Sequence, residues 1–530
     1  MPLRLGRLTN LQMVSNFVVR TGNSSGMTEI ENLSNLRGTL SISGLHNVTN
    51  IKDAIQAKLK TKKNLDEFVL EWSYNSNDSR YETVETEVFD VLEARESLQK
   101  LTIKYYGGKE FPSWLGDSSF TNMVCLHLYV HFVTISSPVT FSQRSQHCRN
   151  GWYKHGGAEF LRGAYPSIKP FPLLEILKFE NMKEWEEWSF KNGVEAFPCL
   201  SQLSILWCRI LKKFSHRFPF LEKLKVQKCE ALESFTGLSQ HENLESEELP
   251  CLRSLFLVCC AKLIELPKSL PSLEALEIDG WLELGAFPRL VNLQKLKFLD
   301  SNAKLLGSIV DFSSLTFLHI RLISFVKCLP ECIIKQFGKL LDLKIAGCGD
   351  LEGLSNEQVG LKHLASLQHL TNSHCPKLVA LPDEEIKLLP ELKLLDLSYC
   401  DNLKKLPCEI QKVNSLRKLR VDWCPKLESF PEQGLPGMLE RLVIRDCGPL
   451  KTLPNMMLQN NKALEYLEIH KCSSLTSLLE QGDLPTRLKR VKIYYCKNLA
   501  SPPDGIMCKD KLTLEYLEID NCSPLSSFQE

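Results

Sequence analysis

Residues 392–407 read LKLLDLSYCDNLKKLP, and similar stretches follow at 416–431 (LRKLRVDWCPKLESFP) and 439–454 (LERLVIRDCGPLKTLP). In each, a leucine at position 0 is followed by apolar residues at +3 and +5, a cysteine at +8, and apolar residues at +11 and +14. The series continues with LEYLEIHKCSSLTSL (464–478), LKRVKIYYCKNL (488–499) and LEYLEIDNCSPLSSF (514–528). These stretches recur about every 24 residues, which is typical of a repeat protein.

The same template extends upstream with more variable spacing. It fits stretches that begin at Leu174, Leu200, Leu221, Leu252, Leu273, Leu293, Leu315, Leu340 and Leu367. The array therefore fills most of the chain, which has 530 residues, 91 of them leucine.

The spacing predicts how each repeat folds. Residues +3 and +5 are two apart, so they face the same side of a short strand, and the residues between them face the other side. One repeat cannot enclose its own apolar set, but parallel neighbours can. Prolines favour an extended return path at Pro267, Pro288, Pro330, Pro382, Pro407, Pro431 and Pro454. We predict an α/β leucine-rich-repeat solenoid, a horseshoe with a parallel β-sheet on its concave face and a mostly irregular or short helical convex side.

The cysteines follow the repeat. Eleven of the twenty occupy the +8 slot: Cys208, Cys229, Cys260, Cys348, Cys375, Cys400, Cys424, Cys447, Cys472, Cys496 and Cys522. A thiol there is a small buried hydrophobe whose S–H can reach a loop carbonyl. The chain contains no Cys-x-x-Cys pair, so no zinc site is expected. The first residues do not resemble a secretion signal, so reduced thiols and a cytoplasmic location are expected.

Charge excludes some partners. The 64 basic and 63 acidic residues balance to a net charge of +1, which argues against binding to nucleic acid or to a membrane surface. Residues 118–143 carry no Asp, Glu, Lys or Arg, but histidines, a proline and hydroxyl side chains dilute their apolar character. We expect a buried strand and an irregular loop there rather than a membrane-spanning helix.

The pattern divides the chain into three parts. Residues 1–117 form irregular repeats, 118–165 a disrupted segment, and 166–530 the regular cysteine-containing repeats. In the first part, 36–48 and 65–73 are expected to be strands, 50–64 a helix capped by Asn50, and 73–87 an exposed loop. Residues 98–117 form a further repeat unit. The window 130–157 loses the leucine pattern, which suggests a frame-disrupted or misjoined repeat.

Several phrases in fixed order carry a family resemblance. LTNLQMVSNFVV, LRGTLSISGLHNV, KKNLDEFVLEWS, LTIKYYGGKEFPSWLGD and PLLEILKFENMKEWEEW precede the regular array. Together they resemble the leucine-rich-repeat region of plant intracellular nucleotide-binding disease resistance proteins of the coiled-coil class. The resemblance implies a sensor of a pathogen effector or of a guarded host protein, which also holds a nucleotide-binding module inactive. The sequence has no G-x-x-x-x-G-K-[ST] loop, so no nucleotide or other cofactor is expected here.

Binding is expected on the concave face. The side chains at positions +2, +4, +6 and +7 of each repeat are predicted to project from this face. Aromatic residues and arginine are the usual anchors of protein interfaces. The candidates are Trp207, Phe256, Phe317, His319, Tyr399, Arg420, Trp423, Arg441, Arg445, Tyr466, His470, Lys492, Tyr494, Tyr495 and Tyr516. If they are exposed, charge reversal at Arg420, Arg441 and Arg445 alters partner binding and leaves thermal stability nearly unchanged.

Other motifs have structural interpretations. Trp185 and Trp188 in EWEEW fall on +11 and +14, so they are expected to pack in the core. The acidic run HENLESEELP (241–250) is expected to be a solvated loop, and His374 a surface residue.

The sequence gives less support to three other functions. A substrate-recruiting subunit of a ubiquitin ligase would need an N-terminal helical adaptor-binding module, whereas residues 1–50 are predicted to be strands. A receptor ectodomain would need a signal peptide and paired capping cysteines. No acid–base or nucleophile constellation indicates an enzyme.

Overall fold

The fold is built from two compact stacks of parallel strands. The computed structural model describes residues 4–21, 26–74, 82–108, 111–112, 114–115, 120–130, 171–183, 185–189, 197–215, 218–234, 249–267, 269–280, 287–307, 312–324, 327–354, 361–381, 383, 385–454, 461–478, 484–500 and 513–522. The first unit comprises residues 1–273 and 283–288, and the second comprises residues 274–282 and 289–530.

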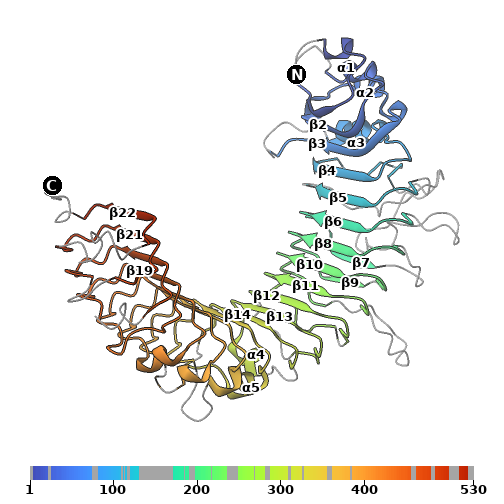
Figure 1. Cartoon of the computed structure of the whole chain (residues 1–530). Coiled ribbons are helices and arrows are strands. Elements are labelled where there is room, and N and C mark those ends of the chain that lie inside the picture. The colour runs from blue at the N-terminus through green and yellow to red at the C-terminus, as the bar shows by residue number, and fades with distance from the viewer. Residues whose placement is uncertain are drawn as a thin grey trace, which may run out of the picture. The chain divides into compact units, whose positions relative to one another are not determined.

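The first unit contains nine strands that pair in chain order (Figure 1). They are β1 (Val14–Val18), β2 (Arg37–Ser43), β3 (Asn64–Glu71), β4 (Lys100–Tyr106), β5 (Cys125–Val130), β6 (Ile176–Glu180), β8 (Gln202–Leu206), β10 (Lys223–Gln227) and β11 (Ser254–Val258). Every pair is parallel. The short strands β7 (Glu187–Ser189) and β9 (Lys213–Ser215) form a second small parallel sheet.

Helices in the first unit are short. They are α1 (Thr28–Glu31), α2 (Ile51–Gln56) and α3 (Glu82–Val91), with 3-10 turns η1 (Leu5–Arg7), η2 (Leu45–Asn47) and η3 (Leu59–Thr61).

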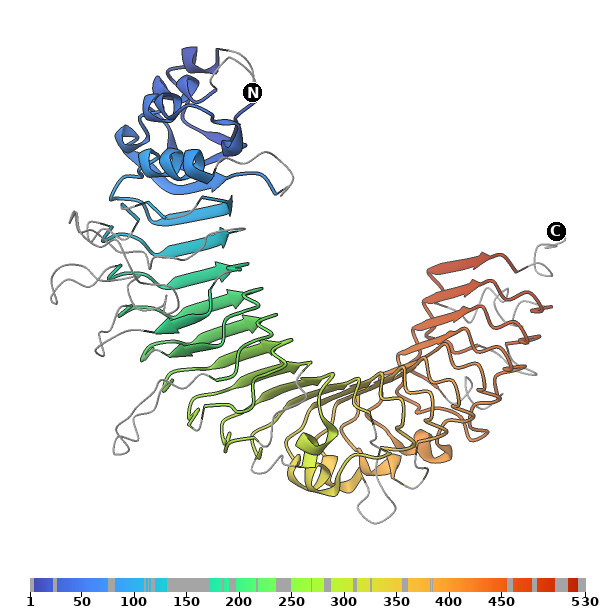
Figure 2. The same cartoon turned by 180° about the vertical axis from the view of Figure 1, so that it is seen from behind.

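The second unit stacks eleven strands, again parallel and in chain order (Figure 2). They are β12 (Ala275–Asp279), β13 (Lys295–Leu299), β14 (Phe317–Arg321), β15 (Asp342–Ala346), β16 (His369–Ser373), β17 (Leu394–Ser398), β18 (Lys418–Asp422), β19 (Arg441–Arg445), β20 (Tyr466–His470), β21 (Arg490–Tyr494) and β22 (Tyr516–Asp520). Neighbours pair at equal template positions, as Leu395 does with Leu419.

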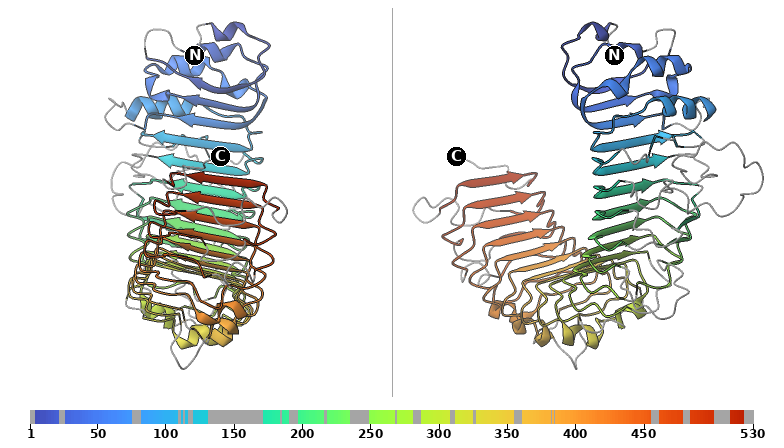
Figure 3. Two further views of the ribbon diagram at one scale, coloured as in Figure 1. Left: turned by 60° about the vertical axis from the view of Figure 1, so that its left-hand side comes forward. Right: turned by 90° about the vertical axis from the view of Figure 1, so that its right-hand side faces the viewer.

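The opposite side of the second unit carries short helices. Here lie α4 (Ala303–Gly307), α5 (Glu331–Gln336), η5 (Leu361–Leu364), η6 (Ile386–Leu388) and η7 (Cys408–Lys412). The strands of this unit line the inner side of its arc, with α4 and α5 on the outer side (Figures 1 and 3). A parallel-sheet solenoid with little helix confirms the predicted fold class.

The template positions form the core. In the repeat that begins at Leu392, the side chains of Leu395, Leu397, Cys400 and Leu403 are completely buried. Pro407 then takes the extended conformation expected of a return path, with φ −57° and ψ 132°. The two tryptophans of EWEEW are also buried, as predicted from their slots.

A left-handed residue occupies +7 in sixteen repeats and directly follows the strand in all of them except β4, which contains Tyr105. The +7 residue has a positive φ in each, for example 55° at Tyr399, 49° at Trp423 and 51° at Lys471. Its amide still donates to the strand of the next repeat, as from Trp423 N to the Arg445 carbonyl at 2.8 Å. The backbone then reverses, so the side chain at +7 points away from the core and the residue at +8 enters it. Left-handed backbone is unfavourable for most L-residues, so the surrounding ladder must maintain it.

The +8 cysteines form a buried row. All eleven are buried and reduced. Each thiol contacts the carbonyl at +6 of its own repeat at 3.3–3.6 Å, the end of the strand rather than a loop. Burial raises the pKa of Cys260 and of Cys472 to about 12, so these thiols stay protonated at neutral pH.

Two local predictions in the first unit need correction. Residues 73–87 were expected to form an exposed loop, but α3 begins at Glu82 and buries Val88 and Phe89 against Trp72. The helix expected over 50–64 ends at Gln56, because Lys58 takes a left-handed conformation and Lys62 turns inward to donate to the Ile30 and Glu31 carbonyls.

Other local predictions are confirmed. Asn50 caps α2 by accepting from Lys52 N at 3.0 Å, and the strands expected within 36–48 and 65–73 are β2 and β3. Within the charge-free segment, β5 is a strand with alternate residues buried.

Some predictions are not tested. Residues 131–170, and with them all but the first residue of the window 130–157, lie outside the described residues, as do 241–248 of the acidic run. The three-part division of the chain remains a prediction. Within the part that the structure describes, no helix has the length and apolar character needed to cross a membrane.

Asn372 provides a test of the core. It occupies a +5 slot on β16 between Ile345 and Leu397, is completely buried, and neither atom of its side-chain amide has a hydrogen-bond partner among the described residues. An unpaired buried amide costs about 1–3 kcal/mol. We therefore expect Asn372→Val to raise the free energy of unfolding by that order, measured by chemical denaturation.

The reverse change is the control. Val421 occupies the same slot on β18, so Val421→Asn should lower the free energy of unfolding by about 2 kcal/mol. Destabilisation by Asn372→Val would mean that the amide has a partner in solution.

Candidate functional site

The candidate site is the exposed side of the strands, which we call the open face. Trp207 and Phe256 belong to the first unit, and the other thirteen predicted residues to the second. All fifteen are at least partly exposed, including Trp423 at 46%, Tyr516 at 44%, Tyr495 at 43% and Tyr399 at 40%. The alternation of buried and exposed residues along each strand produces this placement.

Aromatic side chains stack along the +7 row of the second unit. The rings of His374 and Tyr399 lie 4.2 Å apart and nearly parallel, and those of Tyr399 and Trp423 lie 6.0 Å apart at 22°. We call these three residues the aromatic row. His374 is exposed, as predicted, but its stacking was not expected.

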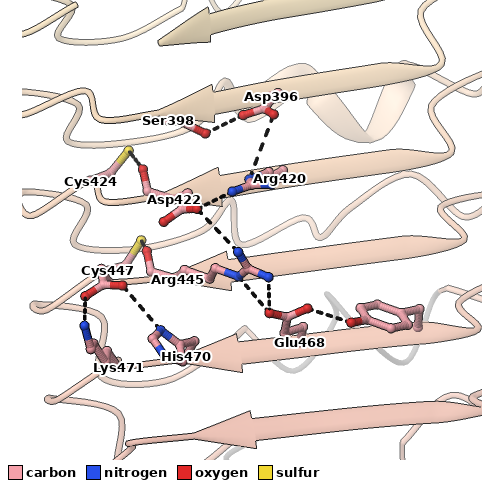
Figure 4. A network of polar contacts seen from close by, with 12 residues as sticks. Asp396, Ser398, Arg420, Asp422, Cys424, Arg445, Cys447, Glu468, His470 and Lys471 are labelled. Carbon is pink, nitrogen blue, oxygen red and sulfur yellow. Dashed lines mark hydrogen bonds and ion pairs between the residues drawn. The ribbon is translucent and has the colours of Figure 1, made fainter. Parts of the chain in front are cut away.

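Acidic and basic side chains alternate across β17–β20. In this polar ladder Ser398 donates to Asp396 at 2.5 Å, and Arg420 donates to Asp422 at 2.5 Å (Figure 4). Arg420 Nε lies 3.9 Å from Asp396, and Arg445 Nη1 lies 3.9 Å from Asp422.

The ladder ends at Glu468. Its carboxylate accepts from Arg445 Nε at 2.7 Å and from the Tyr466 hydroxyl at 2.6 Å. Burial opposes ionisation of Glu468, but the hydrogen bonds from Tyr466 and Arg445 outweigh it, so its pKa is below the usual value. At Asp396 burial dominates instead and raises the pKa.

The ladder corrects the expectation for the arginines. Asp422 and Glu468 are 6% and 5% exposed, so they lie beneath the face rather than on it. Arg420 and Arg445 pair with these buried carboxylates, so charge reversal at either would leave like charges together and lower stability. Position +6 was expected to project from the face, but Leu206, at +6 of the repeat that begins at Leu200, is buried.

Arg441 behaves differently. Its guanidinium lies 3.9 Å from the centroid of the Tyr466 ring, a cation–π contact, and it has no ion pair with any described residue. Charge reversal at Arg441 therefore breaks no ion pair with a described residue, but it removes the contact with the Tyr466 ring and the favourable charge near Glu468.

The last two strands carry a tyrosine-rich cluster. Lys492 Nζ lies 3.2 Å from Glu518, and the Tyr516 hydroxyl donates to Glu518 at 2.7 Å. Hydrogen bonds from Tyr494, Tyr516 and Lys492 lower the pKa of Glu518 to about 2. Beside this cluster, the ring centroids of His470 and Tyr495 lie 5.5 Å apart in a T-shaped arrangement.

Cations also cover isolated aromatic rings on the open face. Lys228 lies 3.9 Å from the centroid of the Trp207 ring in the first unit, and Lys344 lies 5.3 Å from that of Phe317 in the second. Burial and neighbouring cations lower the pKa of His319. These rings are less available than the aromatic row.

A hollow of about 250 Å³ lies over β17–β19. It is lined by Leu394, Leu395, Asp396, Lys418, Leu419, Arg420, Arg441, Val443 and Arg445. Among the described residues, no cluster of His, Cys, Asp or Glu could hold a metal ion. The open face therefore offers rings, cations and an apolar floor, which suit non-covalent binding.

The comparisons with known proteins agree with the sequence resemblance. A family model described as R13L1/DRL21 LRRs matches residues 27–138. A disease resistance protein of Arabidopsis thaliana is 27% identical over 88% of this chain and 36% of its own length. The disease resistance RPP13-like protein 1 of the same plant is 32% identical over 50% of this chain and 26% of its own length.

One solved structure is the plant peptide hormone receptor RGFR1 in complex with RGF2. It matches with a TM-score of 0.42 and 16% identity, over 96% of this chain and 78% of that chain. The chain spans about a quarter to a third of the length of the disease resistance proteins it matches. It is similar to their leucine-rich-repeat regions, and this confirms the predicted resemblance.

Glu468 allows the polar ladder to be tested. Its folded pKa is below the unfolded value of about 4.3. The Glu468 carboxylate therefore stabilises the fold above pH 4.3, and this stabilisation is lost as the pH falls through the folded value. We expect Glu468→Gln to lower the free energy of unfolding by about 2 kcal/mol at pH 7 and by less in acid.

Glu440→Gln is the matched control, because the Glu440–Arg417 pair at 3.4 Å is exposed. It should change the free energy of unfolding by less than about 0.5 kcal/mol. Equal effects of the two substitutions at pH 7 would contradict a special role of the ladder.

Proposed function

We propose that this chain is the sensor region of a plant immune receptor and binds a protein partner through the open face of its second unit. The similarity to plant disease resistance proteins supports the receptor class, and it favours a receptor over a subunit of a ubiquitin ligase. The sensor acts without catalysis, by forming and breaking non-covalent contacts, and it works in the cytoplasm.

The observation that carries this proposal is the aromatic row. Tyr399 and Trp423 are large rings that remain 40% and 46% exposed. Their left-handed backbone and mutual stacking hold them in one orientation, so little side-chain entropy remains to be lost on binding. Rigid, exposed aromatic rings are frequent hot spots of protein interfaces.

The resemblance suggests two kinds of partner. One is a pathogen effector, or a host protein that an effector modifies. The other is the nucleotide-binding module of a full-length receptor, which the repeats would hold inactive until the first partner binds. If both contact the open face, they compete, and this competition would couple sensing to activation.

Removal of the aromatic row tests the proposal. Quantitative affinity purification from leaf extract measures the amount of each partner protein that the chain retains. We expect Tyr399→Ala/Trp423→Ala to reduce this amount at least ten-fold relative to the wild-type chain. Because both side chains are exposed, the melting temperature should change by no more than about 2 °C.

Phe220→Ala/Met438→Ala is the matched control. These residues precede β10 and β19, are 57% and 50% exposed, and lose a comparable apolar area. The control should retain the partners. Recovery of the same proteins with both double variants would refute binding through the aromatic row.

A further inference from the structure

The hollow over β17–β19 has an uneven distribution of charge. Four cations line it, Lys418, Arg420, Arg441 and Arg445, but only one carboxylate, that of Asp396. The aliphatic side chains that face it from its base are those of Leu394 and Val443, whereas Leu395 and Leu419, which also border the hollow, are buried in the core. A space of about 250 Å³ suits one or two side chains rather than a larger ligand.

Two of the cations face each other without an ion pair to any described carboxylate. Lys418 and Arg441 are direct partners in the parallel register of β18 and β19. Neither forms an ion pair within the described part of the chain. Like charges opposite each other destabilise a sheet. By contrast, the arginines at +4 and +6, Arg420 and Arg445, contact carboxylates.

Arg420 adds an unused donor to the same hollow. Its Nε is shielded from solvent and has no hydrogen-bond acceptor among the described residues, since Asp396 lies 3.9 Å away. An unsatisfied buried donor is costly. An anionic group in the hollow would offset the repulsion between Lys418 and Arg441. It would also accept a hydrogen bond from Arg420 Nε.

We infer that the hollow binds the carboxylate side chains of an acidic peptide segment, with an adjacent apolar side chain on the aliphatic base. The inference rests on the proposed function, because the segment belongs to the protein partner of the open face. Two carboxylates of the segment would neutralise Lys418 and Arg441. The carboxylate nearer to Arg420 would also accept a hydrogen bond from its Nε.

The surroundings favour carboxylates over phosphates. The carboxylates of Asp396, Asp422 and Glu468 lie within the polar ladder beside the hollow, so a doubly charged phosphate would meet stronger repulsion. The aliphatic base suits a peptide side chain. The chain's net charge of +1 gives a nucleic acid little long-range attraction.

The experiment measures fluorescence anisotropy of a labelled octapeptide in which glutamate and leucine alternate, titrated with the full chain. We expect Lys418→Gln/Arg441→Gln to weaken binding at least ten-fold relative to wild type. Lys451→Gln/Lys497→Gln removes the same charge from exposed loop positions and should leave the affinity unchanged.

Two further peptides identify the chemistry. An octapeptide of glutamine and leucine should not bind, because it lacks carboxylates. An octapeptide of phosphoserine and leucine should bind more weakly than the glutamate peptide. The inference is overturned if the wild type does not bind the glutamate peptide, if the loop variant loses as much affinity as the hollow variant, or if the phosphoserine peptide binds more tightly.

The two proposals fail in different ways. If Lys418→Gln/Arg441→Gln keeps the partners that depend on Tyr399 and Trp423, the proposed function survives and the acidic segment is refuted. If the glutamate peptide binds as expected but removal of the aromatic row costs no partner, the hollow is an anion site and the proposed function is refuted.

Discussion

The left-handed backbone at +7 is the constraint on which the rest of this structure depends. It reverses the chain at the end of each strand while its amide still pairs with the next repeat, for example Trp423 N with the Arg445 carbonyl. One turn therefore has two consequences. It places the cysteine at +8 in the buried row, and it presents the side chain at +7 to solvent. The scaffold and the aromatic row have the same physical origin, and the +7 side chain can vary without disturbing the core.

The open face separates charges that stabilise the fold from charges that remain available. Arg420 and Arg445 pair with buried carboxylates, so their positive charges are largely neutralised within the protein. Lys418 and Arg441, both at +2, have no such partner within the described residues. A stability measurement and a binding measurement should therefore respond to different residues of the same surface. This division could not be read from residue type, because all four are cations at strand positions that face the same side of the sheet.

The sequence was sufficient for the fold because core slots recur with a fixed spacing. The residues at +3, +5 and +8 have the same buried environment in every repeat, so the structure of one repeat predicts that of the next. The site was predicted less completely. Asp422 at +6 and Glu468 at +4 occupy positions that were expected to project from the face, but arginines of the same or an adjacent strand cover them. The stacking of His374 depends on rings that are 25 or more residues away, and α3 depends on packing against Trp72. Such contacts are tertiary and leave no periodic signal.

Thiol alkylation of the native chain, followed by mass spectrometry, tests the central claim that adjacent residues at +7 and +8 face opposite environments. Cys408 is exposed and serves as an internal positive control. We predict that Cys424, Cys447 and Cys472 resist iodoacetamide, while cysteines introduced by Trp423→Cys and Lys471→Cys react as fast as Cys408. Reaction of the +8 row at the rate of Cys408, or protection of the two introduced thiols, would contradict the turn and with it the account of the open face.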